Sequence, residues 1–170
     1  MRRLVALIIL AIGMVPANAA QRVLMARGYW AALQSEDKRH CQAAARSLRD
    51  APKGVQQARA AFAFDSGRGR RGELHVVLSR AARPGSSVIL FIGGQPFQLA
   101  ARGPDAWSNG PAQEAAIIAA ARVATGMRVE ARDSAGRRFA DRYLLAGAPS
   151  AIDAAAAGCA RSLVNRANRD

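Results

Sequence analysis

The apolar segments of this 170-residue chain are short, and turn-forming residues separate them. They span residues 28–33, 41–48, 55–64, 74–78, 88–92, 97–101, 127–131 and 139–145. Breaks such as Asp50 to Gly54 and Asp133 to Gly136 have the composition of turns. The pattern predicts a mainly β fold of about seven antiparallel strands, arranged as a sandwich or barrel-like domain. The alanine-rich stretch Gln42–Arg46 fits a helical turn equally well.

Two further segments have helical rather than strand character. The first begins at Asn109-Gly110-Pro111, where proline suits the first helical position, and ends near Gly126. The second begins at Ser150, with Asp153 completing a pattern similar to a capping box. Its apolar spacing predicts that Cys159 faces the core. The sequence therefore predicts one helix inserted late among the strands and one at the C-terminal end.

The N-terminal residues have the order of a secretory signal peptide. Arg2 and Arg3 precede an apolar run over residues 4–15, and Ala17-Asn18-Ala19 provides small residues for cleavage. The run is too short for a bilayer span, which takes about 20 residues. We expect residues 1–19 to be a cleaved signal peptide and residues 20–170 to form a single domain. The expected location is the periplasm, the outside of the cell or the outer-membrane surface.

Two cysteines, Cys41 and Cys159, belong to the expected mature protein. An oxidising compartment favours a disulfide bond between them. Because the bond closes a long loop, the chain-entropy model gives it roughly 4 to 5 kcal/mol of stabilisation. The alternative, a pair of redox-active thiols, lacks a C-x-x-C motif.

The chain is strongly basic, with 25 Lys and Arg against 12 Asp and Glu, and almost all the cations are arginine. Such a charge attracts anionic partners, and export leaves lipopolysaccharide, phospholipid head groups or acidic envelope proteins rather than nucleic acid. Residues 66–72 are expected to form a mobile basic hairpin loop. Its Arg68, Arg70 and Arg71 are candidate contacts for an anionic partner, and the alternative is a solvated hairpin tip.

Residues with catalytic or metal-binding chemistry are few. His40 and His75 are the two histidines, and no G-x-S-x-G nucleophile motif is present. Asp141 shares the apolar face of its strand, so we expect it to be paired with an arginine or with backbone amides. Trp30 and Trp107 are predicted to anchor the core or its rim. We therefore predict no catalytic residue, no cofactor and no metal ion.

Several short motifs occur in an order that resembles the invasion-associated locus B family of small exported alphaproteobacterial proteins. The motifs are Gly28-x-Trp30, Cys41, Ile92-Gly93-Gly94-x-x-Phe97, Ala106-Trp107, Gly126-Met127-x-Val129, Asp141-x-Tyr143-x-Leu145-x-Gly147, Ser150-Ala151 and Cys159. The resemblance implies a β-sandwich-like protein of the periplasm or outer membrane, and it supplies no catalytic residues. The abundance of alanine and arginine and the loop at 65–72 depart from the family pattern.

These observations favour a non-enzymatic envelope protein that binds an envelope or host partner. One alternative is a small periplasmic hydrolase, or an inhibitor of one, that uses His75 or Asp141. Another is a purely structural component of the envelope. The hydrolase hypothesis requires His75 and Asp141 to converge in one pocket.

Overall fold

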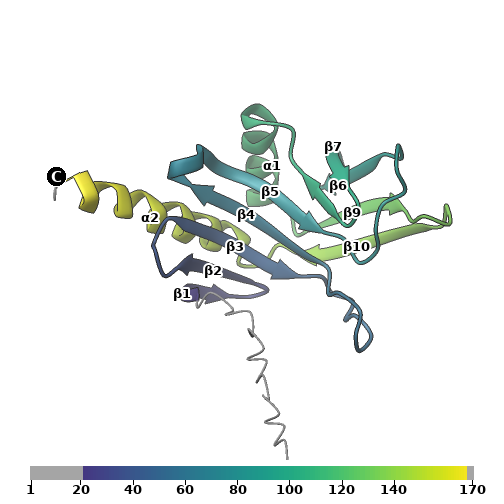
Figure 1. Cartoon of the computed structure of the whole chain (residues 1–170), viewed down its shortest axis with the longest axis horizontal. Helices are drawn as coiled ribbons and strands as arrows, with labels where there is room; N and C mark the ends of the chain where they lie inside the picture. The colour runs from purple at the N-terminus through teal and green to yellow at the C-terminus, as the bar shows by residue number, and fades with distance from the viewer. Residues whose placement is uncertain (1–20, 168–170) are drawn as a thin grey trace, which may run out of the picture.

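The computed structural model describes residues 21–167, and the predicted signal peptide lies outside this range. Helices α1 (Pro111–Val123) and α2 (Ala148–Ala167) accompany a sheet of ten strands (Figure 1). No helix in the described range is long and apolar enough to cross a membrane. The strands are β1 (Gln21–Arg27), β2 (Trp30–Ser35), β3 (His40–Arg46), β4 (Arg59–Asp65), β5 (Arg70–Val77), β6 (Val88–Ile92), β7 (Gln95–Arg102), β8 (Asp105–Trp107), β9 (Gly126–Arg132) and β10 (Arg138–Leu144).

All the strand pairings in the sheet are antiparallel, in the order β1-β2-β3-β4-β5-β8-β7-β6-β9-β10. This confirms the mainly β class with one inserted and one C-terminal helix. The sequence prediction missed β1, which is mostly exposed and has an apolar run of only residues 23–26, and β8, which has three residues. The stretch Gln42–Arg46 belongs to β3 and is not helical, because it pairs with strands on both sides.

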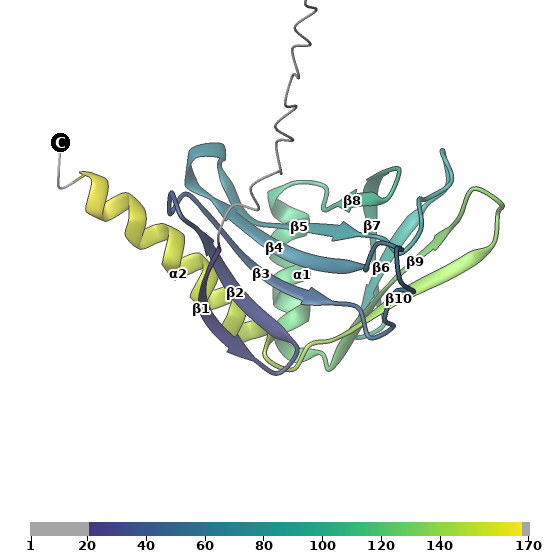
Figure 2. The same cartoon turned by 60° about the horizontal axis from the view of Figure 1, so that its bottom comes forward.

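The sheet curves until its two ends approach each other (Figure 2). The Tyr29 amide donates to the Ala146 carbonyl at 3.0 Å, and the Leu48 amide donates to the Arg142 carbonyl at 2.8 Å. The indole Nε1 of buried Trp30 donates to the Leu144 carbonyl at 2.8 Å. These bonds join the β2 and β3 end of the sheet to β10 and the turn that follows it. The sheet therefore closes through these bonds and not through pairing of its edge strands, since β1 and β10 do not pair with each other.

Two glycines lie where the ends of the sheet cross. Gly28 and Gly147 both have positive φ, +57° and +92°. A Cβ on Gly147 would lie 1.9 Å from the Arg27 carbonyl oxygen, and one on Gly28 would lie 2.2 Å from the Ala146 oxygen. Any larger residue would therefore force the two backbones apart.

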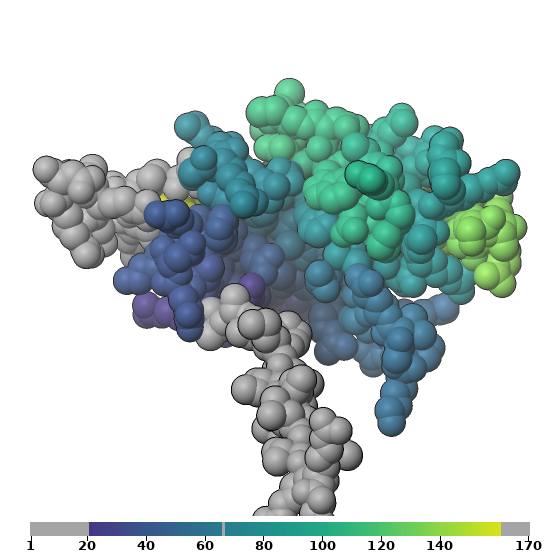
Figure 3. Space-filling model, in the orientation of Figure 1, coloured from purple at the N-terminus to yellow at the C-terminus, as the bar shows by residue number. Residues whose placement is uncertain are grey.

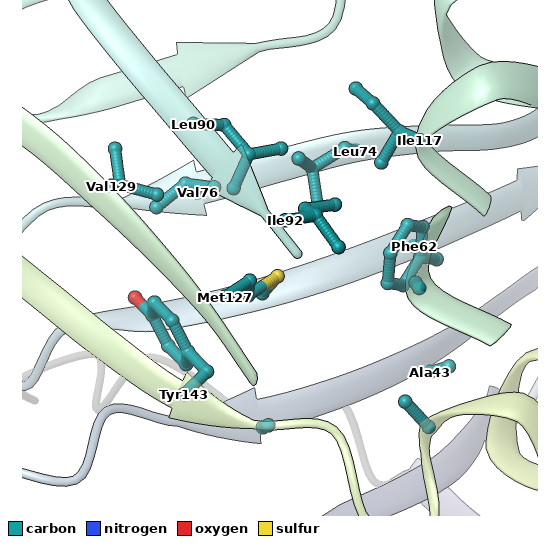
Figure 4. Close-up of a cluster of buried hydrophobic side chains, with 14 of the residues drawn as sticks. Ala43, Phe62, Leu74, Val76, Leu90, Ile92, Ile117, Met127, Val129 and Tyr143 are labelled. Carbon is teal, nitrogen blue, oxygen red and sulfur yellow. The ribbon is translucent and has the colours of Figure 1, made fainter. Parts of the chain in front are cut away.

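The core fills the inside of the curve (Figure 4). Alternate residues of the strands point inward, so that Phe62, Leu74, Ile92 and Val129 are fully buried and belong to the same core cluster as Ile117 of α1. Helix α1 packs mainly on β5, whereas α2 packs on β1 to β4. Burial of these side chains, each worth about 1.5 to 3 kcal/mol, provides the main stabilisation of the fold.

The predicted disulfide joins Cys41 of β3 to Cys159 of α2, at a sequence separation of 118. It therefore fastens the C-terminal helix to the N-terminal half of the sheet. The start of this helix was predicted wrongly: α2 begins at Ala148, and Ser150 lies inside it. Asp153 serves no cap, because its carboxylate forms an ion pair with Arg122 of α1.

Replacing Gly147 with alanine should lower the free energy of unfolding by several kcal/mol, since the new Cβ would overlap the Arg27 carbonyl. The matched control is Gly94→Ala, because Gly94 has a similar φ of +87° but no atom within 4 Å of a built Cβ. This control should cost only the left-handed backbone penalty of about 1 to 2 kcal/mol. Urea unfolding measures both, and equal losses would contradict the crossing as the site of constraint.

Candidate functional site

The arginines predicted from the 66–72 loop lie in different surroundings. The connection is shorter than expected, with a 3₁₀ turn at Ser66–Arg68 and β5 already under way at Arg70. The reason is Asp65, whose buried carboxylate accepts hydrogen bonds from the Gly67 and Arg68 amides and so orders the turn. Arg68 also lies 3.7 Å from the Asp65 carboxylate.

The other two arginines of this group point to different neighbours. Arg70 forms an ion pair with Glu73 at 3.1 Å. Arg71 borders a shallow hollow together with Glu114 and Ile118 of α1. The three side chains therefore do not converge on one point, and two of them already have carboxylate partners.

The two histidines and Asp141 also lie apart. His75 contacts Asp105 at 2.8 Å and stacks on Trp107, with ring centroids 5.3 Å apart. His40 lies 2.8 Å from the Asp65 carboxylate. Asp141 is buried and accepts a hydrogen bond from the Ser79 amide at 2.9 Å, as predicted for a carboxylate on the apolar face.

The geometry therefore does not bring His75 and Asp141 together as the hydrolase hypothesis requires. Asp141 has a second effect on its own strand: burial first, and then the negative charge of Asp141, raise the pKa of the Tyr143 hydroxyl. Within the described residues, no group of three or more His, Cys, Asp or Glu side chains could hold a metal ion.

The β9–β10 hairpin carries an arrangement of arginines that is unusual for a sheet. Arg128 lies directly opposite Arg142, and Arg132 lies directly opposite Arg138. We call these four residues the hairpin arginines. They all share the outward face of the hairpin, because successive members on each strand are four residues apart. Like charges directly opposite each other destabilise a sheet.

Only part of this repulsion is compensated. Arg128 forms an ion pair with Glu130 at 2.6 Å, and its guanidinium lies 4.3 Å from the centre of the Phe91 ring. Arg132 donates to the Gly136 carbonyl at 2.9 Å. Within the described residues, Arg138 and Arg142 have no carboxylate partner.

These two unpaired arginines border a groove of about 940 Å³. One wall is β10, and the opposite wall is the β3–β4 loop, which Figure 3 shows as a protrusion on the same side of the molecule as the hairpin tip. Gln57 holds the loop closed, since its side chain accepts from the Ala51 amide at 2.8 Å and donates to the Ser47 hydroxyl at 2.8 Å. The Leu48–Arg142 backbone bond then fastens the loop to β10.

Arg80 approaches the groove from the β5–β6 connection, and Asp133 fixes its position. The buried Asp133 carboxylate lies 3.3 Å from Arg80 and also accepts bonds from the Ala135 and Arg137 amides. Burial acts to raise the pKa of Asp133, but hydrogen bonds from Arg137 outweigh it and lower the pKa below its ordinary value. The Asp133 carboxylate in the hairpin turn therefore stays ionised. The Arg80 guanidinium lies over the Phe139 ring, 5.8 Å from its centre.

The balance of charge in the groove favours an anion. Arginines outnumber carboxylates there, and one of the carboxylates, Asp141, is already engaged by the Ser79 amide. Guanidinium groups suit phosphate and carboxylate oxygens because they donate paired hydrogen bonds. The lining charged residues are Arg49, Arg80, Arg138, Arg142, Asp50 and Asp141.

Sequence reasoning missed this site, although part of its signal was present. The hairpin was predicted, and the arginines at 128, 132, 138 and 142 are spaced symmetrically about its turn. No sequence pattern indicated that Arg49 would line the groove, because its position there depends on contacts between segments distant in the sequence. No family model, curated protein or solved structure matches the chain.

Replacing Arg138 and Arg142 together with glutamine should raise the free energy of unfolding, by about 0.2 to 1 kcal/mol for each opposed pair relieved. The control Arg122→Gln removes an arginine whose exposed ion pair with Asp153 is already satisfied, so it should leave stability unchanged or slightly lower. Chemical unfolding distinguishes the two. A loss of stability in the double variant would show that the opposed arginines carry no strain.

Proposed function

We propose that this chain is an exported, non-enzymatic protein of the cell envelope that binds an anionic partner through the groove beside β10. The observation that carries the proposal is the presence of directly opposed arginines at a groove, of which Arg138 and Arg142 lack carboxylate partners in the described residues. A feature that opposes folding stability and collects charge at a groove is typical of a binding site.

Export and the envelope location belong to the proposal and rest on the sequence of residues 1–19. Relationship to the invasion-associated locus B family rests on the motif order alone. Several of those motif residues have structural roles. Gly28 and Gly147 form the backbone crossing, and the Trp30 indole donates a hydrogen bond to the Leu144 carbonyl of β10. The candidate partner is an anionic envelope surface or an acidic envelope protein.

Binding to vesicles tests the site with two variants of equal charge. In Arg49→Gln/Arg138→Gln/Arg142→Gln, three groove arginines are removed, and in Arg68→Gln/Arg70→Gln/Arg71→Gln, three arginines of the loop region are removed. Each arginine near an anionic surface contributes about 1 kcal/mol, so the groove variant should lose about a hundredfold in affinity for phosphatidylglycerol vesicles. Protein purified after export should be used, at low and at about 0.15 M salt.

The loop variant should retain nearly the full affinity, although it has lost the same net charge. Equal losses in both variants would indicate non-specific attraction of a basic protein. A larger loss in the loop variant would place the contact at Arg68, Arg70 and Arg71 instead and would contradict the groove as the site.

A further inference from the structure

The groove carries exposed apolar side chains as well as cations. Leu48 is 49% exposed and Val55 is 52% exposed, and both belong to the loop that forms one wall of the groove. The described residues hold few large hydrophobic side chains this exposed. Single exposed hydrophobic side chains scattered over a surface need no explanation. Two on one loop, opposite arginines, indicate a contact surface.

The apolar surface continues inside the groove. Phe139, Pro52 and Ala58 line it together with Leu48 and Val55. A neighbouring hollow shares Leu48 and Arg142 with the groove and adds Phe91. Apolar and cationic groups thus lie side by side over both hollows.

A simple inorganic anion would use the arginines and leave this apolar surface in water. An acidic peptide would also leave it largely unfilled, because its charged side chains favour the solvated rim. A molecule with a phosphate on an apolar body matches both kinds of surface. The groove volume of about 940 Å³ lies in the range of pockets that enclose a substantial part of a small amphiphile, about 300 to 1,000 Å³.

We propose that the groove binds a phosphate-bearing lipid of an envelope membrane. The phosphate contacts Arg49, Arg138 and Arg142, and the apolar chain lies against Leu48, Val55 and Phe139. The protruding loop then enters the interfacial region of the bilayer, while the arginines stay at the level of the head groups. This inference rests on the proposed function and specifies its ligand.

The test is a pair of variants in which the control removes at least as much exposed apolar surface as the groove variant. Leu48→Ser/Val55→Ser changes the groove, and Val23→Ser/Val123→Ser changes two exposed residues outside it, 58% and 85% exposed. Burial of two aliphatic side chains on binding predicts a loss of about tenfold or more in affinity for phosphatidylglycerol vesicles in the first variant. The second variant should bind as the unchanged protein does. Circular dichroism and urea unfolding confirm that both are folded.

High salt and a soluble competitor distinguish binding of the lipid chain from binding of the phosphate alone. At about 1 M salt, where charge attraction is screened within 3 Å, the unchanged protein should keep weak binding that Leu48→Ser/Val55→Ser lacks. Glycerol phosphate, which carries the phosphate without the chain, should compete poorly. Effective competition by glycerol phosphate would overturn the lipid assignment in favour of a soluble phosphate ligand.

The two proposals fail in different ways. If the groove arginine variant loses binding but Leu48→Ser/Val55→Ser does not, the anionic partner stands and the lipid chain is refuted. If phosphatidylglycerol vesicles are not bound at low salt, both the lipid ligand and the anionic-surface partner are refuted.

Discussion

The backbone crossing of Gly28 and Gly147 determines how far the sheet can close on itself. Because neither residue has a Cβ, the turn after β1 and the turn after β10 approach to a distance that no other residue permits. The Trp30 indole and the Tyr29 amide then bond to β10 and the turn after it. The disulfide fixes α2 across the N-terminal strands. A single curved sheet and its two helices therefore enclose the core.

The same closure creates the groove. It brings the loop after β3 against β10, where the Leu48 amide bonds to the Arg142 carbonyl. Arg49 thereby lines the same groove as Arg138 and Arg142, although it lies about ninety residues before them in the sequence. The opposed arginines of the hairpin cost stability on the outside of the sheet, and burial of the core offsets that cost. Side chains from both faces of β10 therefore border the groove: Arg138 and Arg142 from the outward face and Phe139 from the inward face.

Local patterns in the sequence predicted the local structure. Asp133 to Gly136 marked the β9–β10 hairpin correctly because its turn residues flank apolar strands. Ser150 misled the prediction of α2, since a serine followed by an acid three residues later resembles a cap wherever it occurs. The groove was beyond prediction because it depends on the closure of the sheet. The composition of the loop at Arg68 to Arg71 led to its prediction as a contact site. The ion pairs that engage two of its arginines depend on the folded structure and could not be predicted from composition.

The most direct test of the account is a nuclear magnetic resonance titration of the oxidised protein with short-chain phosphatidylglycerol, monitoring arginine Nε–H and aliphatic methyl signals. If the groove binds the phosphate and the chain of one lipid, the Arg49, Arg138 and Arg142 signals should shift together with the methyl signals of Leu48 and Val55, and all of them should saturate at one ligand concentration. Shifts spread evenly over the arginines of the chain, or arginine shifts without the methyl shifts, would contradict it.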